Sequence, residues 1–100
     1  MKERTEEILR QSLLKYRVPY HTHDGIIRYV LFGISPGGFL TAVICNDLTE
    51  SFGRADEENR EALFDIVNWF YNCAPLSCWK SAANMNLWME SLQNKQQETV

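Results

Sequence analysis

One stretch constrains the fold of this chain more than any other, because in it a loop breaks sharply into an apolar helix. It runs from Gly33 to Leu48 and reads GISPGGFLTAVICNDL. Ser35 is a good N-cap, since its hydroxyl can accept a hydrogen bond from an unpaired amide, and Pro36 suits the first helical position. Gly37 and Gly38 then weaken the helix by about 1 kcal/mol each relative to Ala. Either another backbone packs closely there, or a ligand approaches the bare amides; the sequence leaves both explanations open.

The apolar residues recur at helical spacing along most of the chain, and this pattern predicts an all-α fold. A strand over 27–31 is the competing interpretation there, because β-branched and aromatic residues crowd that segment. Helices are expected over about residues 5–17, 24–32, 36–52, 56–73 and 81–92. Their expected N-caps are Thr5, Thr22, Ser35, Asp56 and Ser81. The sequence therefore predicts a compact bundle of four to five short helices with short loops.

The chain is expected to form a single helical domain over residues 1–100. Residues 22–92 would supply its core. Residues 1–20 form a weakly amphipathic helical arm, which either packs loosely or docks on a neighbouring subunit. The polar residues 94–100 are expected to form a frayed tail.

Composition and charge narrow the class of partner. Hydrophobic residues make up 45% of the chain and aromatic residues 12%, more than a small core needs, which favours a buried interface and a homo-oligomer. The net charge of −3, without a basic stripe, argues against nucleic acid as a partner. No apolar run approaches the roughly 20 residues that span a bilayer. The three cysteines, Cys45, Cys73 and Cys78, are an odd number without a secretory signal, so we expect free thiols and a cytoplasmic protein.

The strongest polar constellation lies around the turn between the third and fourth expected helices. It consists of Asn46 and Asp47, of Arg54 and Asp56 in the run Arg54-Ala55-Asp56, and of Asn59. One interpretation is a clasp in which Arg54 pairs with Asp47 while Asp56 caps the next helix. The other is that Arg54 and Asn59 bind a ligand or a partner. Two carboxylates alone do not establish acid/base catalysis, which needs a defined separation and tuned pKa values.

Trp79 is the aromatic residue most suited to binding, because it is expected in a loop, where it could stack on a base or anchor an interface. Cys78 beside it is expected to be accessible. The run from His21 to Asp24 is a weak metal motif, and a solvated loop is the preferred interpretation, so no metal site and no cofactor are expected. In enzymes with a nucleophilic cysteine, a general base lies beside the thiol, and the sequence identifies no such base for these cysteines. We therefore do not expect an enzyme.

Three strings in the chain are distinctive: PGGFLxAVxxNDL within 33–48, GRADxxN at 53–59 and NxxPxxCW at 72–79. On these strings the chain resembles a group of small proteins encoded by bacteriophages, prophages and plasmids, over roughly residues 22–92. The group commonly has Gly-Ser after the tryptophan, whereas this chain has Lys80. By analogy with small phage accessory proteins, the resemblance implies a non-enzymatic protein that blocks a host enzyme or sequesters a defence signal. Signal-sequestering proteins of this kind are typically oligomers that bind cyclic or adenosine-type nucleotides.

The leading hypothesis is therefore a counter-defence protein that sequesters a phosphorylated small molecule, such as a cyclic nucleotide, in the bacterial cytoplasm. The expected ligand-binding residues are Ser35, Gly37, Gly38, Asp47, Arg54, Asn59 and Trp79. Glycine amides would contact phosphate, Arg54 would add charge, and Trp79 would stack on the base. The alternative is a protein–protein interaction module that inhibits or recruits a host protein. It predicts an exposed apolar patch that includes Trp79 or Trp88, and no small-molecule pocket.

Overall fold

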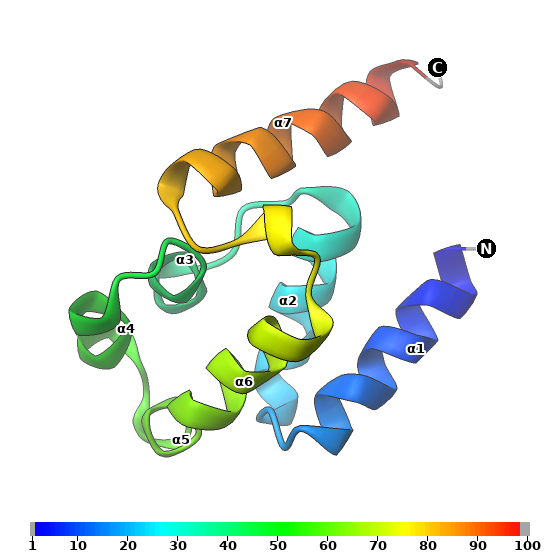
Figure 1. The fold of residues 1–100 in the computed structure, drawn as a ribbon. Coiled ribbons are helices and arrows are strands. Elements are labelled where there is room, and N and C mark those ends of the chain that lie inside the picture. Colours follow the sequence, from blue (N-terminus) through cyan, green and yellow to red (C-terminus); the bar gives the residue numbers. More distant parts are fainter. Residues whose placement is uncertain (1, 99–100) are drawn as a thin grey trace.

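A computed structural model describes residues 2–98 of the chain, and they form an assembly of helices (Figure 1). In chain order the elements are α1 (Lys2–Lys15), α2 (Tyr20–Phe32), α3 (Gly38–Ile44), α4 (Leu48–Arg54), α5 (Glu57–Glu61), α6 (Leu63–Cys73), the one-turn 3-10 helix η1 (Leu76–Cys78) and α7 (Ala82–Glu98). The all-α prediction is confirmed for this part of the chain, with seven α-helices rather than four to five. The strand interpretation of residues 27–31 is wrong, because they lie inside α2.

One apolar core joins the N-terminal and C-terminal parts of the chain. α1 packs against α2 and α6, and α7 packs across α2 and η1 (Figure 1). The largest fully buried apolar side chains are Trp69, Tyr29, Phe70, Leu13, Ile26, Ile27, Ile44 and Ile66. The indole Nε1 of Trp69 donates a hydrogen bond to Oγ of Ser12 in α1 at 2.8 Å. Helix α1 therefore packs against the rest of the chain, and its Leu13 is fully buried in the core.

Helix α2 begins earlier than expected, at Tyr20. Pro19 stands directly before it with φ −55° and ψ 136°, an extended conformation that the proline ring favours. Thr22 therefore lies inside α2 and is buried, so the expectation that it caps the helix is wrong. Gly33 ends the helix in the left-handed conformation, with φ 69°, as expected. A Cβ there would also lie 3.0 Å from the carbonyl oxygen of Met89 in α7.

Helix α3 begins at Gly38, with Gly37 in the N-cap position. The expectations that Ser35 is the N-cap and that Pro36 is the first helical residue are therefore wrong. Gly37 is extended, with φ −69° and ψ 179°, and its carbonyl accepts the first bond of the helix from the amide of Thr41 at 3.0 Å. A serine and a proline suit a loop as well as a helix start, so these residue types did not fix the boundary.

The third expected helix, over 36–52, is broken into α3 and α4 at Asn46. Asn46 adopts a left-handed φ of 64°. Its amide donates to the carbonyl of Val43 and the amide of Asp47 donates to that of Ala42, the paired bonds of a Schellman helix end. The Asp47 carboxylate then caps α4 by accepting from the amide of Glu50 at 3.1 Å. Asparagine and aspartate therefore end one helix and begin the next.

The fourth expected helix, over 56–73, is also interrupted, although only slightly. Ala62, with φ −97° and ψ 10°, separates α5 from α6. The prediction that Asp56 begins this part of the chain is confirmed, because its carboxylate Oδ1 accepts from the amide of Asn59 at 2.7 Å.

The terminal helices are longer than the sequence suggested. α1 starts at Lys2, so Thr5 lies inside it and is not its cap. Ser81 caps α7 as expected, its hydroxyl accepting from the amide of Asn84 at 3.0 Å. α7 then continues to Glu98, through most of the expected frayed tail, whose last two residues lie outside the described range. No helix within residues 2–98 has the length and apolar character needed to cross a membrane.

Candidate functional site

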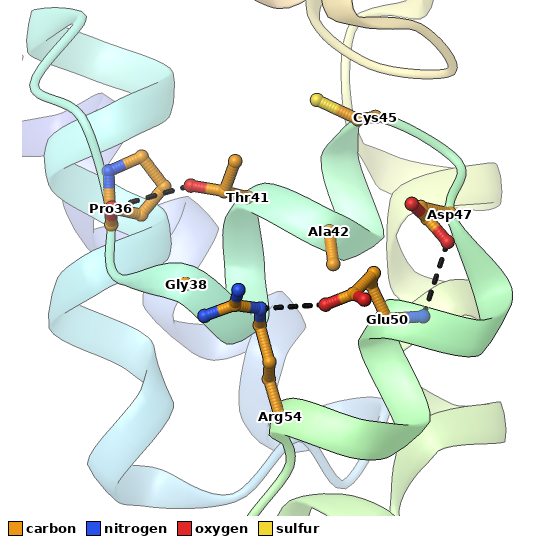
Figure 2. A pocket seen from close by; sticks show the side chains of 8 residues that line it. All are labelled: Pro36, Gly38, Thr41, Ala42, Cys45, Asp47, Glu50 and Arg54. Carbon is orange, nitrogen blue, oxygen red and sulfur yellow. Dashed lines mark hydrogen bonds and ion pairs between the residues drawn. The ribbon is translucent and has the colours of Figure 1, made fainter.

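Three cavities share lining residues around the loop 34–37, which joins α2 to α3. The Arg54 groove, of about 490 Å³, lies between α3 and α4 (Figure 2) and is lined by Pro36, Gly38, Thr41, Ala42, Cys45, Asp47, Glu50 and Arg54. The Arg28 pocket, of about 170 Å³, is lined by Gly25, Arg28, Ile34, Ser35, Pro36 and Gly37. The Phe39 pocket, of about 240 Å³, is lined by His21, Thr22, Gly25, Gly37, Gly38, Phe39, Leu40 and Asn59. Six of the seven expected ligand-binding residues therefore line these cavities; Trp79 does not.

The Arg54 groove carries more negative than positive charge. Nε of Arg54 donates to the Glu50 carboxylate at 2.8 Å, one helical turn away on α4 (Figure 2). The predicted Arg54–Asp47 pair is therefore wrong, because Asp47 caps the same helix instead. One guanidinium and two carboxylates thus line the groove, and a phosphate placed in it would be repelled by the two carboxylates. The phosphate end of a ligand is better accommodated elsewhere around the loop.

Gly38 makes room for the side chain of Arg54. A Cβ on Gly38 would lie 3.0 Å from Nη1 and 3.3 Å from Cδ of Arg54. Close packing of α2 on α3, the first explanation for the two glycines, occurs instead at Gly25, where a Cβ would lie 3.0 Å from Cδ1 of Leu40. Gly38 is therefore explained within the chain, by a side chain and not by a neighbouring backbone.

Gly37 has no such explanation within the chain. Its φ of −69° is open to any residue, and a Cβ there would meet nothing within 4 Å. Glycine is tolerated at an N-cap, but serine, asparagine or aspartate would serve better. The bare backbone of Gly37 therefore faces open space between the Arg28 pocket and the Phe39 pocket.

Arg28 is the site residue that sequence reasoning missed. It lies exposed on α2, and the fold brings it into one pocket with Ser35 and Gly37. Its Nε makes a long 3.4 Å contact with the carbonyl oxygen of Asp24, and no carboxylate among residues 4–95, whose side chains the structure describes, forms an ion pair with it. A guanidinium without a carboxylate partner can bind an anion through two parallel hydrogen bonds. No local sequence motif identifies Arg28 as a site residue. It becomes one only in the folded chain, where the loop 34–37 lies beside α2 and lines the same pocket.

In the Phe39 pocket, the polar residues tie α2 to α5. Thr22 Oγ1 donates to Oδ1 of the buried Asn59 at 2.8 Å. The side-chain amide of Asn59 therefore links α5 to α2. His21 contacts Asp56 through Nε2 at 2.9 Å and Glu58 through Nδ1 at 3.2 Å. The hydrogen bond from the backbone of Asn59, and then that from His21, lowers the pKa of Asp56 below its usual value of 3.8.

The two histidines of the weak metal motif serve different contacts. His21 is exposed beside α5, whereas His23 is 2% exposed and its Nε2 lies 2.8 Å from the carbonyl oxygen of Val18. No group of three histidine, cysteine, aspartate or glutamate side chains within the described part of the chain is arranged to hold a metal ion.

Trp79 lies in the core, away from the three cavities. Its side chain is 6% exposed, and its ring packs on Phe70 with the centroids 5.5 Å apart. Cys78 beside it is fully buried, and burial raises the pKa of its thiol to about 12. The expectations that both residues are accessible are therefore wrong. Lys80 adopts φ 87°, a left-handed conformation that favours glycine over residues with a side chain.

The thiol of Cys45 lines the Arg54 groove. Burial and the nearby Asp47 charge both raise its pKa, and its Sγ lies 3.7 Å from Sδ of Met85. A raised pKa reduces the fraction of reactive thiolate at neutral pH. The groove therefore offers polar and charged contacts but no activated cysteine.

Comparison of the chain with family models, curated proteins and solved structures gives no match. The resemblance to phage and plasmid proteins stays a prediction, and the functional argument depends on the geometry described above.

Proposed function

We propose that this chain is a non-enzymatic binding protein that holds a phosphorylated small molecule, such as a nucleotide or a cyclic nucleotide, over Gly37. The observation that carries the proposal is the open space above Gly37. It is flanked by a pocket with the Arg28 guanidinium, which has no carboxylate partner among residues 4–95, and by a pocket with an aromatic ring. Glycine is tolerated at an N-cap, but no contact among the described residues requires it at this position. A ligand that lies on the bare backbone would require it.

The ligand would lie across two pockets. Its phosphate would bind the guanidinium of Arg28 and the hydroxyl of Ser35, which share the Arg28 pocket with the backbone of Gly37. Its base would enter the Phe39 pocket, where the half-buried ring of Phe39 takes the role that Trp79, buried in the core, does not offer. Arg54 and Asp47, in the groove on the other side of Gly38, would contact polar groups of the ligand.

The biological setting proposed with this activity is that of a small phage-type accessory protein in the bacterial cytoplasm. By analogy with signal-sequestering proteins, it would act in counter-defence by removing a signal nucleotide, and it would do so as a homo-oligomer. This setting depends on the sequence resemblance alone.

Thermal melting with a panel of nucleotides, cyclic nucleotides and inorganic phosphate tests the proposal. A ligand at 100 times its Kd stabilises the folded state by about 2.7 kcal/mol, which raises the Tm of a domain this small by several degrees. Arg28→Gln and Gly37→Asp should each weaken the binding of a stabilising ligand at least tenfold, since one removes a charge and the other adds repulsion. Arg4→Gln, on the exposed surface of α1, is the matched control.

Two outcomes would contradict the proposal. A panel in which no compound raises the Tm would remove small phosphorylated ligands from consideration. A ligand whose affinity is the same in Arg28→Gln, Gly37→Asp and the control would bind away from this loop.

A second candidate function is an interaction module for a host protein, and the exposed apolar side chains of α4 favour it. Leu48 and Phe52 are 72% and 53% exposed on this one helix. The patch expected around Trp79 or Trp88 does not include Trp79, which is buried, while Trp88 is half-buried and donates its Nε1 to the carbonyl of Val30 at 3.2 Å. Loss of host-protein binding in Phe52→Ser, with unchanged Tm, would support this candidate.

A further inference from the structure

Helix α6 has two opposite apolar faces, of which the fold covers one. Its inner face is buried through Ile66, Trp69 and Phe70. Its outer face carries Phe64, Val67 and Tyr71, which are 79%, 37% and 74% exposed. Residues spaced three and seven apart lie on one side of a helix, so these three side chains form a continuous stripe. We call it the outer face of α6; the helix runs across the front of the molecule in Figure 1.

The chemistry of the outer face is neutral. Asn68 and Asn72 flank the apolar stripe, and Asp65 is the one charged residue in the eleven of α6. Asp65 and Asn68 line one pocket with Lys15, Tyr16 and Arg17, at the end of α1 and just after it, so the charged side chains lie along the Asn68 edge and not within the apolar stripe. Nδ2 of Asn72 donates to Oδ1 of Asn68 at 2.7 Å, so these two amides are partly paired with each other. The apolar stripe carries no charge of its own, so it can meet a copy of itself without bringing like charges into contact.

We infer that the outer face of α6 pairs with the same face of a second copy of this chain, with the two α6 helices antiparallel. The direction follows from charge. Helix α5, directly before α6, carries Glu57, Glu58 and Glu61 against one arginine. Parallel helices would bring two such acidic segments together, whereas antiparallel helices place them at opposite ends of the interface. Val67 and Asn68 would then lie near the two-fold axis, and Phe64 of one copy would oppose Tyr71 of the other.

The available area predicts a weak dimer. A buried Phe or Tyr covers roughly 150–250 Å², so the exposed parts of Phe64 and Tyr71 offer on the order of 300 Å² per copy. Val67 and the two asparagines extend this area. Through these two rings, two copies together bury on the order of 600 Å², and the total stays below the range of about 1,200–2,000 Å² that specific, stable interfaces bury. The dimer should therefore form and dissociate within the micromolar to millimolar range of concentration.

Sedimentation equilibrium of the ligand-free protein, over that range, tests the inference. Wild type should change from monomer to dimer as its concentration rises. Phe64→Glu should weaken the dimer at least tenfold, because it places a carboxylate on the apolar face of the partner. Leu87→Glu is the matched control, since Leu87 is 66% exposed on α7 and away from this face. All of these positions are exposed, so circular dichroism and Tm should show that each variant folds.

A charge exchange tests the antiparallel arrangement itself. Tyr71→Glu and Phe64→Lys should each be monomeric alone, yet the mixture should form a heterodimer, because one native pair and one Glu–Lys pair then meet. Wild type that stays monomeric at millimolar concentration would overturn the inference, as would a dimer that Leu87→Glu disrupts and Phe64→Glu does not. A mixture that remains monomeric would overturn the antiparallel pairing. This inference develops the homo-oligomer part of the proposed function, and its ligand-free test can fail while the ligand panel succeeds, or the reverse.

Discussion

At the scale of single residues, the carboxylate of Asp56 joins α5, which it caps, to α2. One oxygen accepts from the amide of Asn59 at 2.7 Å and caps α5, and the other lies 2.9 Å from Nε2 of His21 on α2. Both contacts favour the ionised form and lower the pKa of Asp56 below 3.8. Protonation of Asp56 is therefore harder in the folded than in the unfolded state, and acid should weaken the fold here.

Asp56→Asn separates the charge of this residue from its capping hydrogen bond, because asparagine caps as well as aspartate. A lowered pKa stabilises the folded state fully above the unfolded value, and this stabilisation disappears as the pH falls through the folded pKa. We therefore expect urea unfolding to give wild type a higher free energy of unfolding than Asp56→Asn at pH 7. The gap should narrow as the pH falls below 3.8. The neighbouring exposed Glu57→Gln is the control, and an equal, pH-independent effect of both substitutions would contradict the assignment.

The sequence predicted some residue roles correctly because the signals are local. Asp56 and Ser81 were expected to begin their helices, and each accepts a hydrogen bond from an amide three residues on. The partner of Arg54 was predicted wrongly, because Glu50 reaches it within one turn of a helix whose limits the sequence had not revealed. Arg28 could not be predicted as a site residue, since only the folded chain brings it beside Ser35.

At the scale of elements, apolar spacing predicts that a segment is helical better than it predicts where the helix ends. The spacing of Val43, Ile44 and Leu48 is continuous, so residues 36–52 were expected to form one helix. In the structure Leu48 is 72% exposed, and the left-handed Asn46 turns the chain before it. The low helix propensity of Asn and Asp was the available signal.

Asn46→Ala distinguishes one continuous helix over 36–52 from two helices separated at Asn46, because it should change the free energy of unfolding in opposite directions in the two cases. In one continuous helix, alanine would stabilise the protein by up to about 0.7 kcal/mol. In the observed turn, with φ 64°, it should destabilise by about 1 kcal/mol, because an alanine Cβ is strained in the left-handed region. Asn46→Gly should be close to neutral, since glycine tolerates that region but loses more entropy on folding. Urea unfolding of the three proteins measures the difference, and a stabilised alanine variant would contradict the break at Asn46.

At the scale of the whole molecule, the candidate site depends on how separate segments are assembled. Its three cavities take residues from α2, the loop 34–37, α3, α4 and α5. Helix α2 supplies Arg28 to this site on its outer side, while its buried residues belong to the core that α1 also enters. Anything that loosens the core around α2 should therefore also weaken ligand binding, although the change lies far from the loop in sequence.

Two adjacent leucines on α1 test whether this helix belongs to that core. Leu13 is fully buried, whereas Leu14 is 61% exposed. Leu13→Ala should lower the free energy of unfolding by about 2–5 kcal/mol, because it removes buried contacts and leaves a cavity. Leu14→Ala, the same chemical change one position away, should alter it by less than about 0.5 kcal/mol. Since a small domain is stable by only about 5–15 kcal/mol, the Leu13 variant should melt many degrees lower. If urea unfolding gave equal effects for the two substitutions, α1 would not contribute to the apolar core.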